Sequence, residues 1–232
     1  MTEPDFIMVE MDILGVMRPV RMERRAAVCY LEARAAHESK VNQLRLEAEA
    51  AVRRWAAVDR NNDIALMADS LGPIRRYFVA VGSGQRTGLL LGLLEQASTT
   101  MFWALLREAW SACDGTWPYR DRLLRLLRKH TRHENPHSFL HDDEQRAFDD
   151  LPDPINVYRG CSRMRIKGLS WTVDLNIAAA FARGNRGIAV PQPVIASGQI
   201  PKSHVFAYYT DRHESELLID PRHVAGLRIK SY

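Results

Sequence analysis

Apolar residues in the first part of the chain recur at helical spacing. The segment from Val20 to Ala57, preceded by Pro19, has no glycine or proline and is rich in residues that favour helices. Its apolar positions form only a thin stripe, so we expect this helix to lie on a partner surface. Three further helices are expected, over Leu89 to Ala112, Tyr119 to His130 and Asp142 to Asp149.

The pattern changes after Leu151-Pro152-Asp153-Pro154, which is the clearest boundary in the sequence. Short β-type runs follow, and one helix, from about Asp174 to Arg183, interrupts them with Asp174 placed to cap its first turn. The expected strands cover 156–158, 194–196, 205–209, 216–219 and 227–229. We therefore predict an α+β protein in which a mainly helical region, residues 1–150, packs on a small split mixed or antiparallel sheet, residues 151–232.

Composition adds few constraints. The 232 residues are 46% hydrophobic and 26% charged, which indicates a folded globular protein rather than a disordered one. A formal net charge of +4 permits contact with nucleic acid or an acidic protein without requiring either. Three scattered cysteines, an acidic N-terminus and no apolar run long enough for a membrane span favour a cytoplasmic protein.

A polar constellation stands out in the β-type region. Glu214 and Glu216 are two apart before the apolar run Leu217 to Ile219, so on a strand both carboxylates would share one face while Ser215 points away. We expect this strand to lie at a sheet edge. Ser170 and Thr172 repeat the spacing on another expected strand, with Trp171 on the opposite face.

Arg159, within Tyr158-Arg159-Gly160, supplies a cation on a third segment. Each of these polar residues alone would be read as a surface group. Their common occurrence on three expected strands favours a functional site.

The order Tyr158-Arg159-Gly160, then Gly168-Leu169-Ser170-Trp171-Thr172 before a helix, then Glu214-Ser215-Glu216-Leu217-Leu218 resembles the arginine–serine–glutamate class of mono-ADP-ribosyltransferases. The resemblance covers residues 155 to 232. It implies an ADP-ribosyltransferase-like catalytic core, NAD as substrate, release of nicotinamide and no metal. The chain departs from the class in reading Ser-Trp-Thr for the common Ser-Thr-Ser, and in a very short loop, 210–213, before the glutamates.

The resemblance assigns a role to each motif residue. Arg159 would hold the NAD pyrophosphate or the adjoining ribose, because a guanidinium fork suits phosphate oxygens. Ser170 would bond to the nicotinamide-ribose side and orient the catalytic carboxylate, with Thr172 on the same wall. Glu216 would stabilise positive charge on the sugar during cleavage, and Glu214 would orient or deprotonate the incoming nucleophile.

Two aromatic residues adjoin these positions. Trp171 and Phe181 are most simply core residues, one on a strand and one on a helix. Either could also form a wall of the cofactor pocket.

The acceptor is left open by the sequence. In this class a glutamate rather than a glutamine at the first motif position, here Glu214, favours a protein arginine as the acceptor. Nucleic acid is the alternative acceptor, because the 120–132 segment is rich in arginine. The ordinary interpretation of that helix face is a solvated surface. A toxin, effector, phage-related or defence protein fits the class, and an inhibitory or antitoxin partner is possible. The rival interpretation is a non-catalytic module of the same fold that binds a partner through the basic helix.

Two other motifs favour ordinary structural interpretations. Val81 to Gly88 is glycine-rich but lacks the Lys-Ser/Thr of a phosphate loop, so we expect a loop between helices. The histidines at 130, 133, 137 and 141 have no partner carboxylate or thiol at a familiar spacing, and Pro136 interrupts their helix. We therefore expect solvated or helix-capping histidines there.

Overall fold

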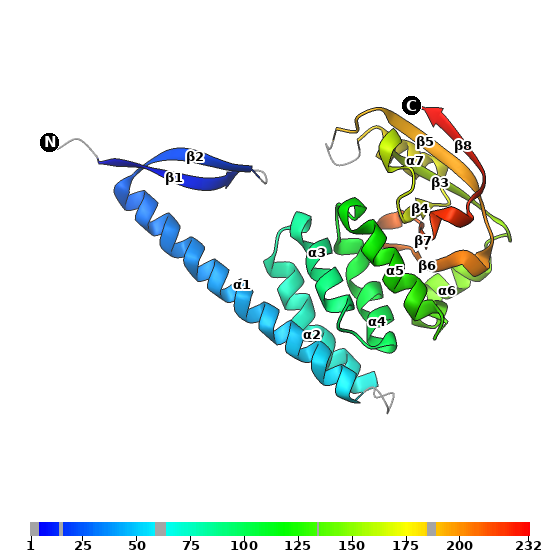
Figure 1. Ribbon diagram of the computed structural model, residues 1–232, viewed down its shortest axis with the longest axis horizontal. Coiled ribbons are helices and arrows are strands. Elements are labelled where there is room, and N and C mark those ends of the chain that lie inside the picture. The colour runs from blue at the N-terminus through cyan, green and yellow to red at the C-terminus, as the bar shows by residue number, and fades with distance from the viewer. Residues whose placement is uncertain (1–4, 14–15, 59–63, 134, 185–188) are drawn as a thin grey trace. The chain divides into compact units, whose positions relative to one another are not determined.

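The computed structural model describes residues 5–13, 16–58, 64–133, 135–184 and 189–232 (Figure 1). The chain forms two compact units, residues 1–85 and 86–232. The fold is α+β, as the sequence predicts, with the observed strands paired in two antiparallel sheets. Among the described residues, no helix combines the length and apolar character needed to cross a lipid bilayer.

The first unit is a β-hairpin followed by two helices that lie side by side (Figure 1). Its elements are β1 (Phe6–Ile13), β2 (Val16–Glu23), α1 (Arg24–Val58) and α2 (Ile64–Ala80). The helix expected to begin at Val20 begins instead at Arg24, because residues 20 to 23 pair with β1. α1 buries Val52 and Trp55, and α2 buries Ile74 and Phe78, so only one stripe of α1 is covered, as expected.

The second unit begins with helices. They are α3 (Ser83–Leu94), which contains the boundary between the units, α4 (Thr99–Ala109), α5 (Arg120–Thr131) and α6 (Asp142–Asp149). The sequence predicts the last two of these helices closely. The single helix expected from Leu89 to Ala112 is two helices, because α4 starts anew at Ser98, whose hydroxyl accepts from the Met101 amide. Only Val81 and Gly82 lie between α2 and α3, so the expected glycine-rich loop is mostly helical.

The main sheet has the strand order β6-β7-β4-β3-β5-β8. Its strands are β3 (Ile155–Ser162), β4 (Ser170–Thr172), β5 (Pro193–Ile200), β6 (Val205–Tyr209), β7 (Glu216–Ile219) and β8 (Ala225–Ser231), and helix α7 (Leu175–Ala182) follows β4. The expectation that the glutamate-bearing strand lies at an edge is wrong. β7 lies between β6 and β4, with Trp171 opposite Leu217 and Tyr208 opposite Leu217 on the other side.

Helices α4, α5 and α6 belong to the same compact unit as the main sheet. Phe148 of α6 packs in one hydrophobic cluster with Val157, Trp171 and Leu217 of three strands. The two compact units divide between Gln85 and Arg86, whereas the sequence pattern changes after residue 150.

Helix α7 lies directly on β3 because residue 160 is a glycine. A Cβ at Gly160 would overlap the carbonyl oxygen of Ala178 in α7. This close approach brings the helix that follows β4 against the strand that carries Arg159.

We expect Gly160→Ala to lower the free energy of unfolding of the second unit by about 1–3 kcal/mol, because the added methyl must displace a packed backbone. Gly92→Ala in α3 is the matched control, since a Cβ there meets nothing within 4 Å. In a helix interior that change should stabilise by about 0.5–1 kcal/mol. Urea unfolding of both variants measures the difference, and equal stabilities would contradict the assigned role of Gly160.

Candidate active site

One cavity of about 400 Å³ in the second unit brings the motif residues together. It lies where β3, β4, α7 and the start of β7 meet the segment that follows α4. All seven residues predicted for the site line it: Arg159, Ser170, Trp171, Thr172, Phe181, Glu214 and Glu216. A volume of this size lies within the range of small-molecule sites in proteins.

Glu216 is the best-anchored acidic group of the cavity. Its Oε1 accepts a hydrogen bond from Trp110 Nε1 at 2.9 Å, and the Ser170 hydroxyl also bonds to the carboxylate. Burial raises the pKa of Glu216 above its usual value, while the bonds from Ser170 and Trp110 oppose that shift. The nearby Glu214 charge adds to the rise, and the Arg159 charge opposes it.

Glu214 does not lie on the strand with Glu216, contrary to the alternation argument. It ends a short 3-10 helix, η8 (Asp211–His213), and Ser215 has φ +44°, in the left-handed region that non-glycine residues seldom adopt. β7 begins only at Glu216. Both carboxylates nevertheless line the cavity, because the turn at Ser215 brings Glu214 to it.

The Thr172 hydroxyl is committed to the backbone of this turn. It donates to the carbonyl oxygen of Glu214 at 2.8 Å and accepts from the Asp174 amide at 3.1 Å. Asp174 in turn caps α7, with its carboxylate accepting from the Asn176 amide at 2.7 Å. Thr172 is thus placed to hold Glu214 and α7 in position, in addition to lining the cavity.

Arg159 is held by main-chain carbonyl groups. Its guanidinium donates to the carbonyl oxygen of Arg165 at 3.1 Å and to that of Ser170. A Cβ at residue 168 would overlap the guanidinium, so Gly168 makes room for it. Burial lowers the pKa of Arg159, and the Glu216 charge is among the effects that oppose this.

The two aromatic candidates differ in environment. The Trp171 indole belongs to the hydrophobic core cluster, and its Nε1 donates to the Gly168 carbonyl oxygen at 3.0 Å. Phe181, on α7, is only partly buried beside the cavity. Of the two, Phe181 is the one with exposed area to offer a ligand.

The sequence reasoning missed the contribution of the helical region to the cavity. Trp110, Asp114, Thr116 and Trp117 line it from the segment after α4. Trp110 ends an apolar run, which made it look like an ordinary core residue. No local pattern marks it as the partner of a carboxylate 106 residues away.

A second link fixes the turn that carries Glu214. Arg107 of α4 forms ion pairs with Glu144 of α6 at 2.8 Å and with Asp211 of η8 at 3.0 Å. Glu144 is 1% exposed and also accepts a bond from the Thr210 amide. A buried charged pair of this kind holds its partners in a fixed geometry.

The four clustered histidines do not converge. His130 is buried against Phe102, bonds to Thr99 at 3.0 Å and has a pKa that burial lowers to about 4, so it is neither solvated nor a helix cap. His137 bonds to the Val205 carbonyl at 2.9 Å. Within the described ranges, no group of three or more histidine, cysteine, aspartate or glutamate side chains is arranged to hold a metal ion.

Comparisons of the chain with protein-family models, with curated proteins and with solved structures found no match.

Proposed function

We propose that the protein is an NAD-dependent mono-ADP-ribosyltransferase that transfers ADP-ribose to a macromolecular acceptor and releases nicotinamide. The observation that carries the proposal is the single cavity lined by Arg159, Ser170, Glu214 and Glu216. These residues are spread over 58 positions of the chain. A core would not gain stability from two neighbouring carboxylates.

The donors and acceptors of the cavity suit a dinucleotide. Arg159 carries a fixed positive charge for phosphate oxygens, and Glu216 can accept from a ribose hydroxyl. Phe181 and Trp117 provide flat apolar surface within the same cavity for a ring of the ligand. Bound NAD would supply the glycosidic bond to nicotinamide, which is the bond to be cleaved.

The chain's own residues divide the work of such a reaction. Glu216, held by Trp110 and Ser170, places a negative charge where positive charge develops on the sugar. Glu214, on the turn fixed by Thr172, would orient the acceptor nucleophile and take its proton. A protein arginine or a nucleic acid group can serve as acceptor in this scheme.

The rival function is a non-catalytic module of this fold that binds a partner through α5. Incubation with NAD and measurement of free nicotinamide separates the two functions. Release above that of a Glu216→Gln sample supports the enzyme. Absence of release, both alone and with a whole-cell lysate as acceptor source, would favour the binding module.

We expect Trp110→Phe to move the acidic limb of the pH–rate profile to higher pH. The indole stabilises the ionised form of Glu216, so its removal should raise that pKa further, and a carboxylate that must be charged is then lost at a higher pH. Nicotinamide release across the pH range measures the shift, with NAD affinity retained. A uniform loss of rate with an unchanged pH profile would show that Trp110 is only structural.

A further inference from the structure

A second cleft, of about 900 Å³, lies in the same unit and shares no lining residue with the candidate active site. It is formed by the end of α5, the start of β6 and a short 3-10 helix, η9 (Pro221–His223). Cationic and imidazole side chains make up half of its described lining residues, among them Arg128, Arg132, His133, His204, Arg222 and His223. Among the lining residues that the structure describes, Asp220 is the one with a carboxylate. We call this cleft, with its lining residues, the basic cleft.

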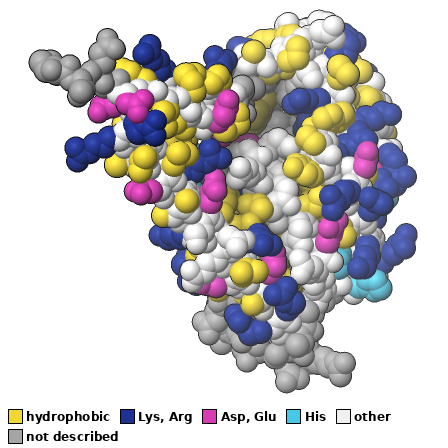
Figure 2. Space-filling model, turned by 60° about the vertical axis from the view of Figure 1, so that its left-hand side comes forward, with side chains coloured by type: hydrophobic (Ala, Val, Ile, Leu, Met, Phe, Trp, Pro, Cys, Tyr) yellow, Lys and Arg dark blue, Asp and Glu magenta, His cyan; other side chains and the backbone are white. Residues whose placement is uncertain are grey.

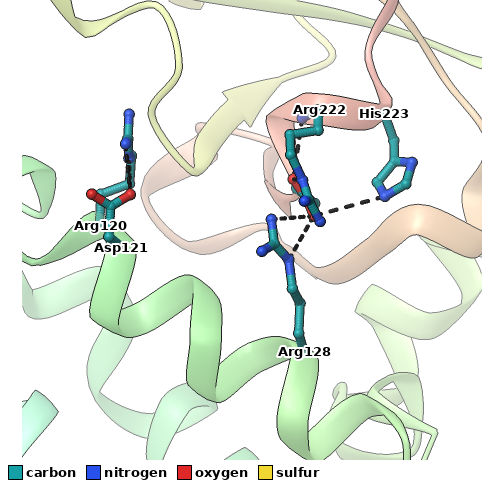
Figure 3. A network of polar contacts seen from close by, with 6 residues as sticks. Arg120, Asp121, Arg128, Arg222 and His223 are labelled. Carbon is teal, nitrogen blue, oxygen red and sulfur yellow. Dashed lines mark hydrogen bonds and ion pairs between the residues drawn. The ribbon is translucent and has the colours of Figure 1, made fainter.

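The one carboxylate organises the cations around it (Figure 3). Asp220 is 3% exposed and pairs with Arg128 of α5 at 2.7 Å and with Arg222 of η9 at 3.0 Å, while His223 Nε2 lies 3.7 Å away. Burial acts against the charged carboxylate, yet the bonds from Arg222 and Arg128 lower its pKa overall. The single negative charge of Asp220 holds Arg128 and Arg222 in place but cannot neutralise both of them, so this group keeps a net positive charge.

The exposed face of α5 extends this positive charge beyond the cleft. Arg125 and Lys129 of α5 and its C-cap residue Arg132 are exposed and follow the spacing i, i+4 and i+7, so they lie along one side. In the described part of the chain no acidic side chain is found within ion-pair distance of these three. By contrast, Arg122 is paired with Glu95 at 2.6 Å.

The cations of α5 are not equivalent. Arg128 is tied to Asp220 and Arg120 pairs with its neighbour Asp121 at 2.6 Å, so within the described residues only part of the helix offers unpaired cations. On the face of the molecule seen in Figure 2, Lys and Arg side chains, in dark blue, gather towards the right, with His side chains in cyan beside them.

The basic cleft also offers a flat surface. The rings of His204 and His223 stack at 3.8 Å between centroids with planes 4° apart, and both side chains are exposed. Planar side chains of this kind stack on unpaired bases, whereas bases inside a duplex are inaccessible to them. Stacking surface beside a row of cations is the combination that single-stranded nucleic acid requires.

The extent of the row indicates a polymer rather than a single phosphate. With a rise of about 1.5 Å per residue, Arg125 and Arg132 are roughly 10 Å apart along the helix axis, a span that suits successive phosphates of a strand better than one phosphoryl group. An acidic peptide would satisfy the charge but would leave the stacked imidazoles without a matching ring. We propose that the basic cleft and the adjoining face of α5 bind single-stranded nucleic acid through its phosphates and at least one base.

Binding of a fluorescein-labelled 20-nucleotide oligo(U), measured by anisotropy over a salt series without NAD, tests the proposal. Arg125→Gln/Arg132→Gln should weaken binding at least ~5-fold at low salt, and the salt slope should fall by about 1.4, because each lost phosphate contact removes about 0.7. Neither residue takes part in the Asp220 ion pairs, so the fold should be retained. Ser203→Glu, which adds a negative charge to the cleft lining, should weaken binding similarly.

The matched control is Arg228→Gln/Lys230→Gln, which removes two exposed cations from β8, an element that does not line the cleft. It should change the affinity less than 2-fold. Equal losses in both double variants, or no binding of the oligonucleotide at low salt, would overturn the proposal. Retained affinity for an acidic peptide together with none for oligo(U) would assign the cleft to a protein partner instead. Because the assay contains no NAD, its result is separate from that of the transferase proposal.

Discussion

Glu216→Gln should reduce nicotinamide release by on the order of 10²-fold or more, while NAD affinity and the fold are retained. The amide keeps the size of the side chain and can still accept from Trp110, but it carries no charge. A charge that acts when positive charge develops on the sugar contributes mainly to the transition state, so its loss lowers kcat rather than raising KM. Steady-state kinetics of nicotinamide release, with thermal melting as the folding control, measures both quantities.

Glu214→Gln is the informative comparison because Glu214 lines the same cavity on a neighbouring turn. It should reduce transfer to an acceptor more than hydrolysis of NAD by water, since the lost carboxylate handles the nucleophile. Equal losses in the two reactions would contradict the proposed role of Glu214 in orienting the nucleophile. Near-normal nicotinamide release by Glu216→Gln would exclude Glu216 from the mechanism.

The elements of the last third of the chain could be predicted because their signals are local. Strands β6 and β7 agree with the expected spans, since the short apolar runs there are bounded by Asp and Pro. The N-terminal hairpin was missed because residues 20 to 23 carry no feature that separates them from the helix-favouring segment that follows. Their strand conformation depends on pairing with β1.

The sequence indicated which residues line the candidate site, but it did not indicate how these residues are arranged. Alternation predicted a common face for Glu214 and Glu216, and the structure reaches the same cavity through a left-handed Ser215 instead. The contacts from Trp110 and Arg107 were not predictable, because they join residues more than 100 positions apart. Such contacts depend on how α4 packs against the sheet, which periodicity does not encode.

Arg159→Ala should raise the KM for NAD by on the order of 10- to 100-fold, with a smaller effect on kcat, because a charge-assisted bond to phosphate is worth about 1.5–3 kcal/mol. The proposed partner is present in both substrate and transition state, so its loss affects binding uniformly. The structure adds a second consequence, because Arg159 also donates to the carbonyl groups of Arg165 and Ser170. Some loss of stability is therefore expected in the alanine variant.

Arg159→Lys separates these two roles. A lysine keeps the positive charge but cannot reproduce the planar fork that reaches two carbonyl groups and a phosphate together, so it should recover only part of the NAD affinity. KM and melting temperature are measured for both variants, with Arg163→Ala as a control, since Arg163 is exposed directly after β3 and does not line the cavity. Full recovery by lysine would show that residue 159 acts only as a point charge. A melting temperature lowered in both variants with an unchanged KM would assign Arg159 to the fold, because the carbonyl contacts would then account for all of its effect.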